Sequence, residues 1–156
     1  ISACLVGSEM CIRDRLQIAM VAAGIANEGV VMNPRLVDTV IGNDLSVIRS
    51  YDDTQFGHAT DATIADQITA SMVASVSNGA AQGARIDGVD VAGKTGTTEN
   101  GNKPYTLWFT GFAPADDPEV AVAVLVEDGG GQGQSGSGDT IAAPIAKKVI
   151  EAVLGR

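Results

Sequence analysis

The stretch Gly88-Val89-Asp90-Val91-Ala92-Gly93-Lys94-Thr95-Gly96-Thr97 decides how this sequence is interpreted. Its first eight residues fit the phosphate-binding pattern G-x-x-x-x-G-K-[ST], in which a glycine-rich loop leads into a helix whose N-terminus faces phosphate groups. Two features argue against a phosphate loop. Residues 89–92 alternate between apolar and polar side chains as a strand does, and the residues after Thr95 are unsuited to start a helix. The stretch therefore favours a strand that ends in an exposed Lys-Thr-Gly, with a nucleotide site as a distant alternative.

The segments that flank this strand follow in a characteristic order. Upstream lie Leu16-Gln17-Ile18-Ala19 and Ala26-Asn27-Glu28-Gly29; downstream lie Trp108-Phe109-Thr110-Gly111-Phe112-Ala113-Pro114 and the apolar run 120–126. Lys-Thr-Gly is one of the signatures of β-lactamases and penicillin-binding proteins. The ordered set resembles the C-terminal part of the transpeptidase domain of a penicillin-binding protein, within the serine β-lactamase and D,D-peptidase superfamily. This resemblance covers about residues 16–155.

The resemblance and the hydrophobic periodicity together predict an α+β fold. We expect a partial antiparallel sheet, made of the three C-terminal strands of the family's five-stranded β-lactamase-like sheet and flanked by helices. The predicted elements are helices at 16–28, 62–77 and 140–154, a small hairpin of 35–40 and 45–49, loops at 50–60 and 129–138, and strands at 89–96, 105–113 and 119–126.

Three details of these elements are also predicted. The second helix should begin at a cap formed by Thr60 or Asp61. Its buried stripe should consist of Ile64, Ile68, Met72, Val73 and Val76. The last strand is a continuous apolar run, which indicates that both of its faces are covered.

Residues 1–15 match nothing in the family and show no clean periodicity. We expect them to be an artefactual or non-native segment, and residues 16–156 to be the C-terminal part of a penicillin-binding transpeptidase domain. Both cysteines, Cys4 and Cys11, fall in this first segment.

Composition excludes several classes of function. The chain has 156 residues, which favours one domain, and a formal net charge of −9. Its ten Lys and Arg residues are scattered, so no nucleic-acid partner is expected. No apolar run reaches the length of about 18 residues that a membrane span needs. No metal site and no organic cofactor are predicted, because the cysteines lack partners with metal-ligand spacing and the resemblance implies no cofactor.

The resemblance also implies the roles of the Lys-Thr-Gly residues. Lys94 would lie in the floor of a cleft, and Thr95 and Thr97 would contact the carboxylate of a peptidoglycan stem peptide ending in D-Ala-D-Ala, or of a β-lactam. Gly96 would leave room for the substrate backbone, and the N–H of Thr97 would be an oxyanion-hole donor. Lys94 and Thr97 are thus the predicted catalytic residues. Trp108 is assigned to the core.

The nucleophile of serine acyl transfer is missing from the sequence. No serine is followed by lysine three residues later or by asparagine two residues later, so the family's Ser-x-x-Lys and Ser-x-Asn motifs are both absent. We expect both motifs to precede residue 16 in a longer parent protein, and the chain alone to be inactive.

The predicted parent is a peptidoglycan D,D-transpeptidase that cross-links stem peptides. The resemblance places it on the extracytoplasmic face of the bacterial cytoplasmic membrane, anchored by a helix outside this chain, with cell-division or elongation proteins as candidate partners. Two alternatives remain open: a non-catalytic cell-wall interaction domain of the same fold, and a β-lactamase or D,D-carboxypeptidase. The long turn at 99–104 and the flanking segments favour the transpeptidase.

Overall fold

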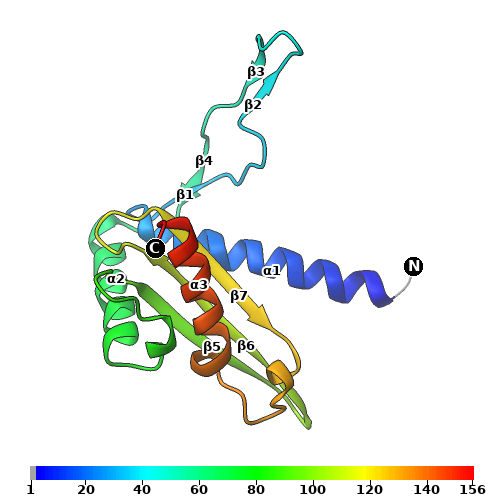
Figure 1. Ribbon diagram of the computed structural model, residues 1–156, viewed down its shortest axis with the longest axis vertical. Helices are drawn as coiled ribbons and strands as arrows, with labels where there is room; N and C mark the ends of the chain where they lie inside the picture. Colours follow the sequence, from blue (N-terminus) through cyan, green and yellow to red (C-terminus); the bar gives the residue numbers. More distant parts are fainter. Residues whose placement is uncertain (1–2) are drawn as a thin grey trace.

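A computed structural model describes the backbone of residues 3–156 and the side chains from residue 13 onward. Its centre is a three-stranded antiparallel sheet in the order β5-β6-β7, formed by Ala92–Asn100, Lys103–Ala113 and Val120–Val126. Helix α3 (Ala143–Val153) crosses one face of the sheet, helix α1 (Ala3–Ala26) lies against the other, and α2 (Ala62–Ser77) packs beside β5 (Figure 1). The predicted α+β fold, with a partial antiparallel sheet flanked by helices, is confirmed.

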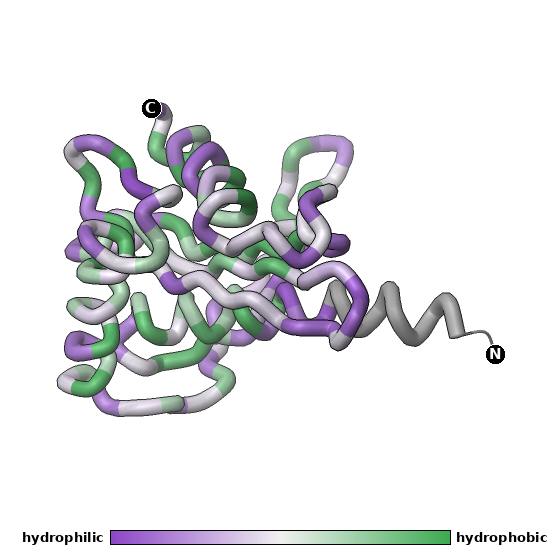
Figure 2. Tube along the Cα trace, turned by 90° about the horizontal axis from the view of Figure 1, so that it is seen from below, coloured by the Kyte–Doolittle hydropathy of each residue, from purple (hydrophilic) through white to green (hydrophobic). Residues whose placement is uncertain are grey.

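Two hydrophobic clusters hold the sheet between its helices. The cluster on the α3 face joins Phe109 and Leu107 of β6 to Ile150 of α3, and all three side chains are fully buried. The smaller cluster on the α1 face contains Phe112 and, from α2, Met72. Hydrophobic and hydrophilic residues alternate along α2 and α3, as expected for helices with one buried face (Figure 2).

The meander of three strands is confirmed, with different bounds. Strand β5 begins at Ala92 instead of residue 89 and runs on to Asn100, which pairs with Lys103. The turn is therefore only Gly101-Asn102, and the long turn predicted at 99–104 is wrong. Polar residues on both sides of the turn continue the ladder because backbone hydrogen bonds do not require apolar side chains. Strand β7 is covered by α1 and α3 on its two faces, as predicted.

Helix α2 agrees with its predicted bounds. Asp61 caps it, since its Oδ1 accepts a hydrogen bond from the N–H of Ile64 at 2.9 Å. Met72 and Val76 are buried as predicted, and Ala65 is buried between them and the cap. The predicted burial of Ile64 is wrong, since its side chain remains 45% exposed.

Helix α1 is longer than predicted. It begins at Ala3 instead of residue 16 and ends at Ala26, two residues before the predicted end. Gly29 follows it with a φ of +86°, and a Cβ there would lie 2.2 Å from the carbonyl oxygen of Thr60. Only glycine fits this close approach. That residues 1–15 are a non-native segment stays a prediction.

The segment before α3 is more regular than the predicted loop. A 3₁₀ turn spans Asp128–Gly131 and a π-helical turn spans Gly138–Ala142, directly before α3. The hydroxyl of Ser137 accepts from the N–H of Thr140 at 3.2 Å and so caps this turn. Pro144 lies in the first turn of α3, as predicted.

Residues 30–58, here called the arm, project from the body as two successive two-stranded ladders (Figure 1). Strand β1 (Val30–Met32) pairs with β4 (Gln55–His58), and β2 (Thr39–Ile41) pairs with β3 (Val47–Ser50). The predicted hairpin is thus confirmed. The predicted loop at 50–60 is wrong, because β4 lies within it.

None of the helices in the described region combines the length and the apolar composition that crossing a bilayer requires.

Candidate functional site

The Lys94–Thr97 stretch lies in the middle of strand β5. Lys94 pairs with Thr110, and the antiparallel ladder continues without a break through Thr97. Lys94 is followed directly by more of strand β5 and not by a helix, so the geometry of a phosphate loop is excluded.

The two glycines that completed the phosphate pattern have structural roles. Gly88 has a φ of +75° in the tight turn where Ile86 and Val89 form an isolated bridge. A Cβ on Gly93 would lie 2.5 Å from the ring of Phe109, which fills the space above it. Backbone conformation and core packing therefore account for both glycines.

Lys94 lines a cavity of about 420 Å³ on the α1 face of the sheet. Trp108 and Thr110 of β6 form one wall, and Gln17 and Ile18 of α1 form another. This is the face on which Gly96 also lies, because residues 94 and 96 alternate with 95 and 97 along the strand.

The ammonium group of Lys94 has no carboxylate partner within 4.0 Å among the described residues. Its Nζ donates to the main-chain oxygen of Thr95 at 2.6 Å, and the side chain is exposed. Asp14 lines the same cavity without forming an ion pair to Lys94. A flexible, exposed ammonium of this kind is available to an anionic ligand.

Thr95 and Thr97 lie opposite Phe109 and Leu107 of β6, on the α3 side of the strand. The hydroxyl of Thr95 donates to the main-chain oxygen of Ala80 at 3.0 Å. Thr97 is exposed and is not part of the cavity lining. The structure thus brings Lys94, Thr95 and Gly96 to one cavity and leaves Thr97 outside its lining.

Trp108, which was predicted to belong to the core, also lies in this region. It is partly exposed, faces the cavity and lies directly opposite Gly96 in the β5–β6 register. The sequence offers no signal for this position. A turn at Gly101-Asn102 alone would place residue 107 opposite residue 96, and the register shift between Thr98 and Asn100 brings Trp108 there instead, on the face of Lys94.

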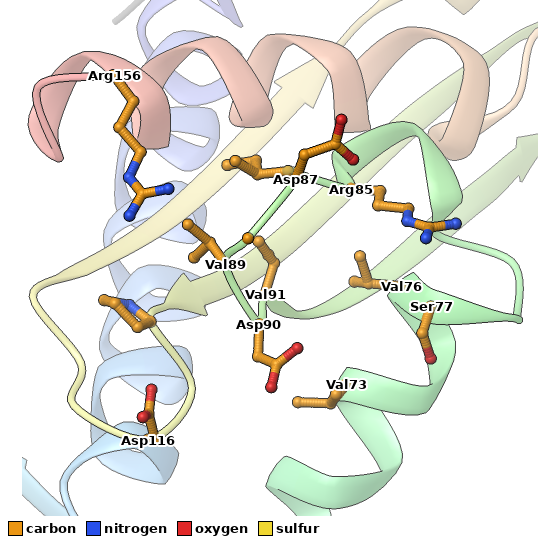
Figure 3. A pocket seen from close by; sticks show the side chains of 13 residues that line it. Val73, Val76, Ser77, Arg85, Asp87, Val89, Asp90, Val91, Asp116 and Arg156 are labelled. Carbon is orange, nitrogen blue, oxygen red and sulfur yellow. The ribbon is translucent and has the colours of Figure 1, made fainter.

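A second cavity, of about 590 Å³, lies at the start of β5 between α2 and the connector 85–91. Figure 3 shows the guanidinium groups of Arg85 and Arg156 on opposite sides of it, with the carboxylate of Asp90 between α2 and the loop that carries Asp116. No ion pair joins these four side chains. Its lining carries no part of the predicted site, and we assign it no role.

The described residues contain no group of three or more His, Cys, Asp or Glu side chains arranged to hold a metal ion.

Comparison with known proteins decides the family. The sequence model of the penicillin binding protein transpeptidase domain matches residues 15–151. The chain belongs to this family. The resemblance inferred from the ordered motifs is confirmed.

Relatives and solved structures of the transpeptidase family agree with this membership. Peptidoglycan D,D-transpeptidase PbpA of Mycolicibacterium smegmatis is 46% identical over 143 residues, which are 89% of this chain and 29% of the relative. PbpA of Mycobacterium tuberculosis H37Rv is 43% identical over 87% of this chain and 28% of its own length.

Among solved structures, penicillin-binding protein A from M. tuberculosis as a ceftriaxone acyl-enzyme complex superposes with a TM-score of 0.81 at 43% identity, covering 87% of this chain and 31% of that one. The D,D-transpeptidase domain from Eggerthella lenta gives 0.79 at 39% identity, covering 88% and 31%. The chain therefore spans less than a third of the length of these relatives.

Proposed function

We propose that this chain is the substrate-carboxylate-binding part of a peptidoglycan D,D-transpeptidase, and that Lys94, Thr95, Gly96 and Thr97 form its binding strand. The relatives named above are peptidoglycan D,D-transpeptidases, and one related structure is an acyl-enzyme complex with a β-lactam. The proposed ligand is the terminal carboxylate of a D-Ala-D-Ala stem peptide, or the equivalent carboxylate of a β-lactam.

One observation carries this proposal: Lys94–Thr97 occupies the outer strand of the sheet. Strand β5 pairs with β6 on one side only, and no other strand of the described region bonds to its free edge. An extended peptide can therefore add along β5 and place its terminal carboxylate beside Lys94.

The two faces of β5 would serve the ligand differently. Lys94 approaches from the α1 face with a positive charge, whereas Thr95 and Thr97 offer hydroxyl groups from the α3 face. For Thr95 this requires exchanging its present hydrogen bond to Ala80 for one to the ligand.

Gly96 and the N–H of Thr97 would act through the backbone. A side chain at residue 96 would project toward Trp108 on the cavity face, since a Cβ there lies 3.4 Å from the Cβ of Trp108. The N–H of Thr97 would be one oxyanion-hole donor, and the loss of such a donor raises the barrier by about 2.7–4 kcal/mol.

The reaction assigned to the whole protein is serine acyl transfer. The serine oxygen attacks the penultimate D-Ala carbonyl, the terminal D-Ala leaves, and an amine of a second stem peptide then attacks the acyl-enzyme and releases the serine. This chain contains neither Ser-x-x-Lys nor Ser-x-Asn, so the attacking serine belongs to the larger protein. We place that protein at the extracytoplasmic face of the cytoplasmic membrane, with cell-division or elongation proteins as its partners.

Fluorescent-penicillin labelling of the longer protein that contains this chain tests the proposed roles. We expect Thr97→Pro to slow acylation by about 10²–10³-fold, the loss measured for an oxyanion-hole donor. Lys94→Ala should also slow acylation, because the substrate carboxylate loses its cation. Thr97→Val keeps the N–H and separates the backbone role from that of the hydroxyl. Lys147→Ala, on α3, is the matched lysine control. Acylation unaffected by Lys94→Ala in a folded protein would refute the assignment.

The chain by itself offers a complementary test. We expect no covalent labelling by fluorescent penicillin, because the attacking oxygen is absent. Labelling of the purified chain would contradict this part of the proposal. In the longer protein, rapid hydrolysis of a chromogenic β-lactam would favour the β-lactamase alternative over the transpeptidase.

A further inference from the structure

The arm exposes hydrophobic side chains that the body does not cover. No member of either buried cluster lies in residues 30–58. Contiguous exposed apolar surface on a protein marks an interaction site more often than scattered single residues do. The most exposed apolar side chains of the arm are Leu36, Ile41, Leu45, Val47, Ile48 and Phe56.

Polar cross-links hold the arm together in place of a core. Arg35 forms ion pairs with Asp38 at 3.0 Å and with Asp53 at 2.9 Å. It also donates to the main-chain oxygen of Tyr51, and the N–H of Tyr51 donates to the oxygen of Asp38 at 3.0 Å. The base of the β2–β3 hairpin is thus fixed before any partner arrives, which lowers the entropy cost of binding.

The β2–β3 hairpin also has unpaired strand edges. Its two strands pair only with each other among the described residues, and every residue in them is exposed. Each outer edge presents main-chain N–H and C=O groups that an additional strand can bond.

Charge defines the kind of strand that fits. Asp44 at the tip and Asp52 at the base have no ion-pair partner among the described residues, whereas Arg35 already pairs with two carboxylates. Arg49 is stacked 4.5 Å above the ring of Tyr51. The carboxylates without partners favour lysine or arginine on an incoming segment.

We propose that the arm is the docking surface for an extended segment of another protein, in which apolar residues alternate with lysine or arginine. The segment adds as a strand to the β2–β3 hairpin, covers apolar side chains such as Val47 and Ile48, and places its cations near Asp44 and Asp52. This inference does not depend on the proposed reaction.

The same observations disfavour two other occupants. A second copy of this chain carries the same net charge of −9 and would bring like charges together. An anionic membrane surface would meet the carboxylate of Asp44 at the tip of the arm.

Titration of the chain with two synthetic octapeptides tests the proposal, one alternating valine with lysine and the other alternating valine with glutamate. We expect the lysine peptide to bind at least about tenfold more tightly, with hydrogen-exchange protection confined to residues 38–50. The double variant Val47→Thr/Ile48→Thr should lose at least about tenfold in affinity. Val153→Thr on α3, a similarly exposed valine, should lose none.

A second variant keeps the test valid if the threonines loosen the hairpin. Asp44→Asn/Asp52→Asn retains the shape of both side chains and should remove most of the preference for lysine over glutamate. Equal binding of the two peptides, no binding of either, or protection located in the body would overturn the proposal. If the chain self-associates and Val47→Thr/Ile48→Thr abolishes this association, the occupant is a second copy of the chain. If the chain floats with phosphatidylcholine–phosphatidylglycerol vesicles, the occupant is a membrane. Either result would also overturn the proposal.

Discussion

The body and the arm are two β-structures held together by different forces. In the body, large side chains such as Phe109 and Phe112 are fully buried between the sheet and its helices. In the arm, ion pairs and backbone hydrogen bonds connect the strands while apolar side chains such as Ile48 face water. Hydrophobic burial is the dominant favourable term in folding, so the body should fold as the cooperative unit and the arm should open locally. The same kind of substitution should therefore have different effects in the two regions.

Truncating one large apolar side chain in each region gives the largest expected difference. Phe109→Ala should lower the free energy of unfolding by about 3–5 kcal/mol, because it leaves a cavity among fully buried residues. Ile48→Ala should change it by less than about 0.5 kcal/mol, since Ile48 is already 67% exposed. Urea denaturation of both variants measures the difference. Equal losses would show that the arm has a core after all.

Adding one methyl group in each region should give the next largest difference in unfolding free energy between the body and the arm. A Cβ on Gly111 of β6 would lie 2.3 Å from the main-chain oxygen of Ala92, whereas a Cβ on Gly57 of β4 would meet no atom within 4 Å. Gly111→Ala should therefore cost about 1–3 kcal/mol in unfolding free energy, and Gly57→Ala should be nearly neutral. Thermal unfolding followed by circular dichroism measures both. A marked loss of unfolding free energy in Gly57→Ala would show that Gly57 is closely packed against other atoms.

Removing the polar cross-link should affect the arm alone. Arg35→Met deletes both ion pairs of Arg35, yet exposed pairs contribute only about 0–1 kcal/mol each, so global stability should change little. Local opening should increase, and amides of residues 38–51 should exchange faster while those of β6 stay protected. Hydrogen exchange read by mass spectrometry gives this profile. Unchanged exchange in the arm would assign its rigidity to another contact.

Acid should loosen the tip of the arm, and this is the smallest of the effects predicted here. Hydrogen bonds from the hydroxyl and the N–H of Ser46 hold the pKa of Asp44 below its ordinary value of 3.8. Because the folded-state pKa is the lower one, the stabilisation is present above the unfolded-state value and is lost as pH falls through the folded-state pKa. The amide shift of Ser46 should therefore titrate with a midpoint below 3.8 and stop titrating in Asp44→Asn. A midpoint above 3.8 would contradict this.

The same contrast explains which elements could be predicted from sequence. The meander and α2 carry strong signals, because their buried residues recur at strand or helix periods and Asp61 provides a recognisable cap. Strand β4 carries no such signal. Its residues are exposed or only partly buried, and its ladder with β1 depends on backbone bonds that any sequence can make.

The predicted ends of the strands at the turn between β5 and β6 were wrong for a related reason. The polar residues 99–104 suggested a long turn, although Glu99 and Asn100 continue β5 to a two-residue turn. At the site, the strand through Lys94 and Gly96 was predicted because Lys-Thr-Gly and its flanks are local in sequence. Trp108 was assigned to the core because its position depends on the register between two strands, which a single strand does not reveal.

Trp108 has one practical consequence. It is the only tryptophan in the chain, and it lines the cavity that contains Lys94. Its indole emission therefore reports on that cavity alone, without a dye or an introduced label. Molecules that enter beside the sheet should shift or quench this intrinsic signal, whereas events at the distant hairpin should leave the spectrum unchanged.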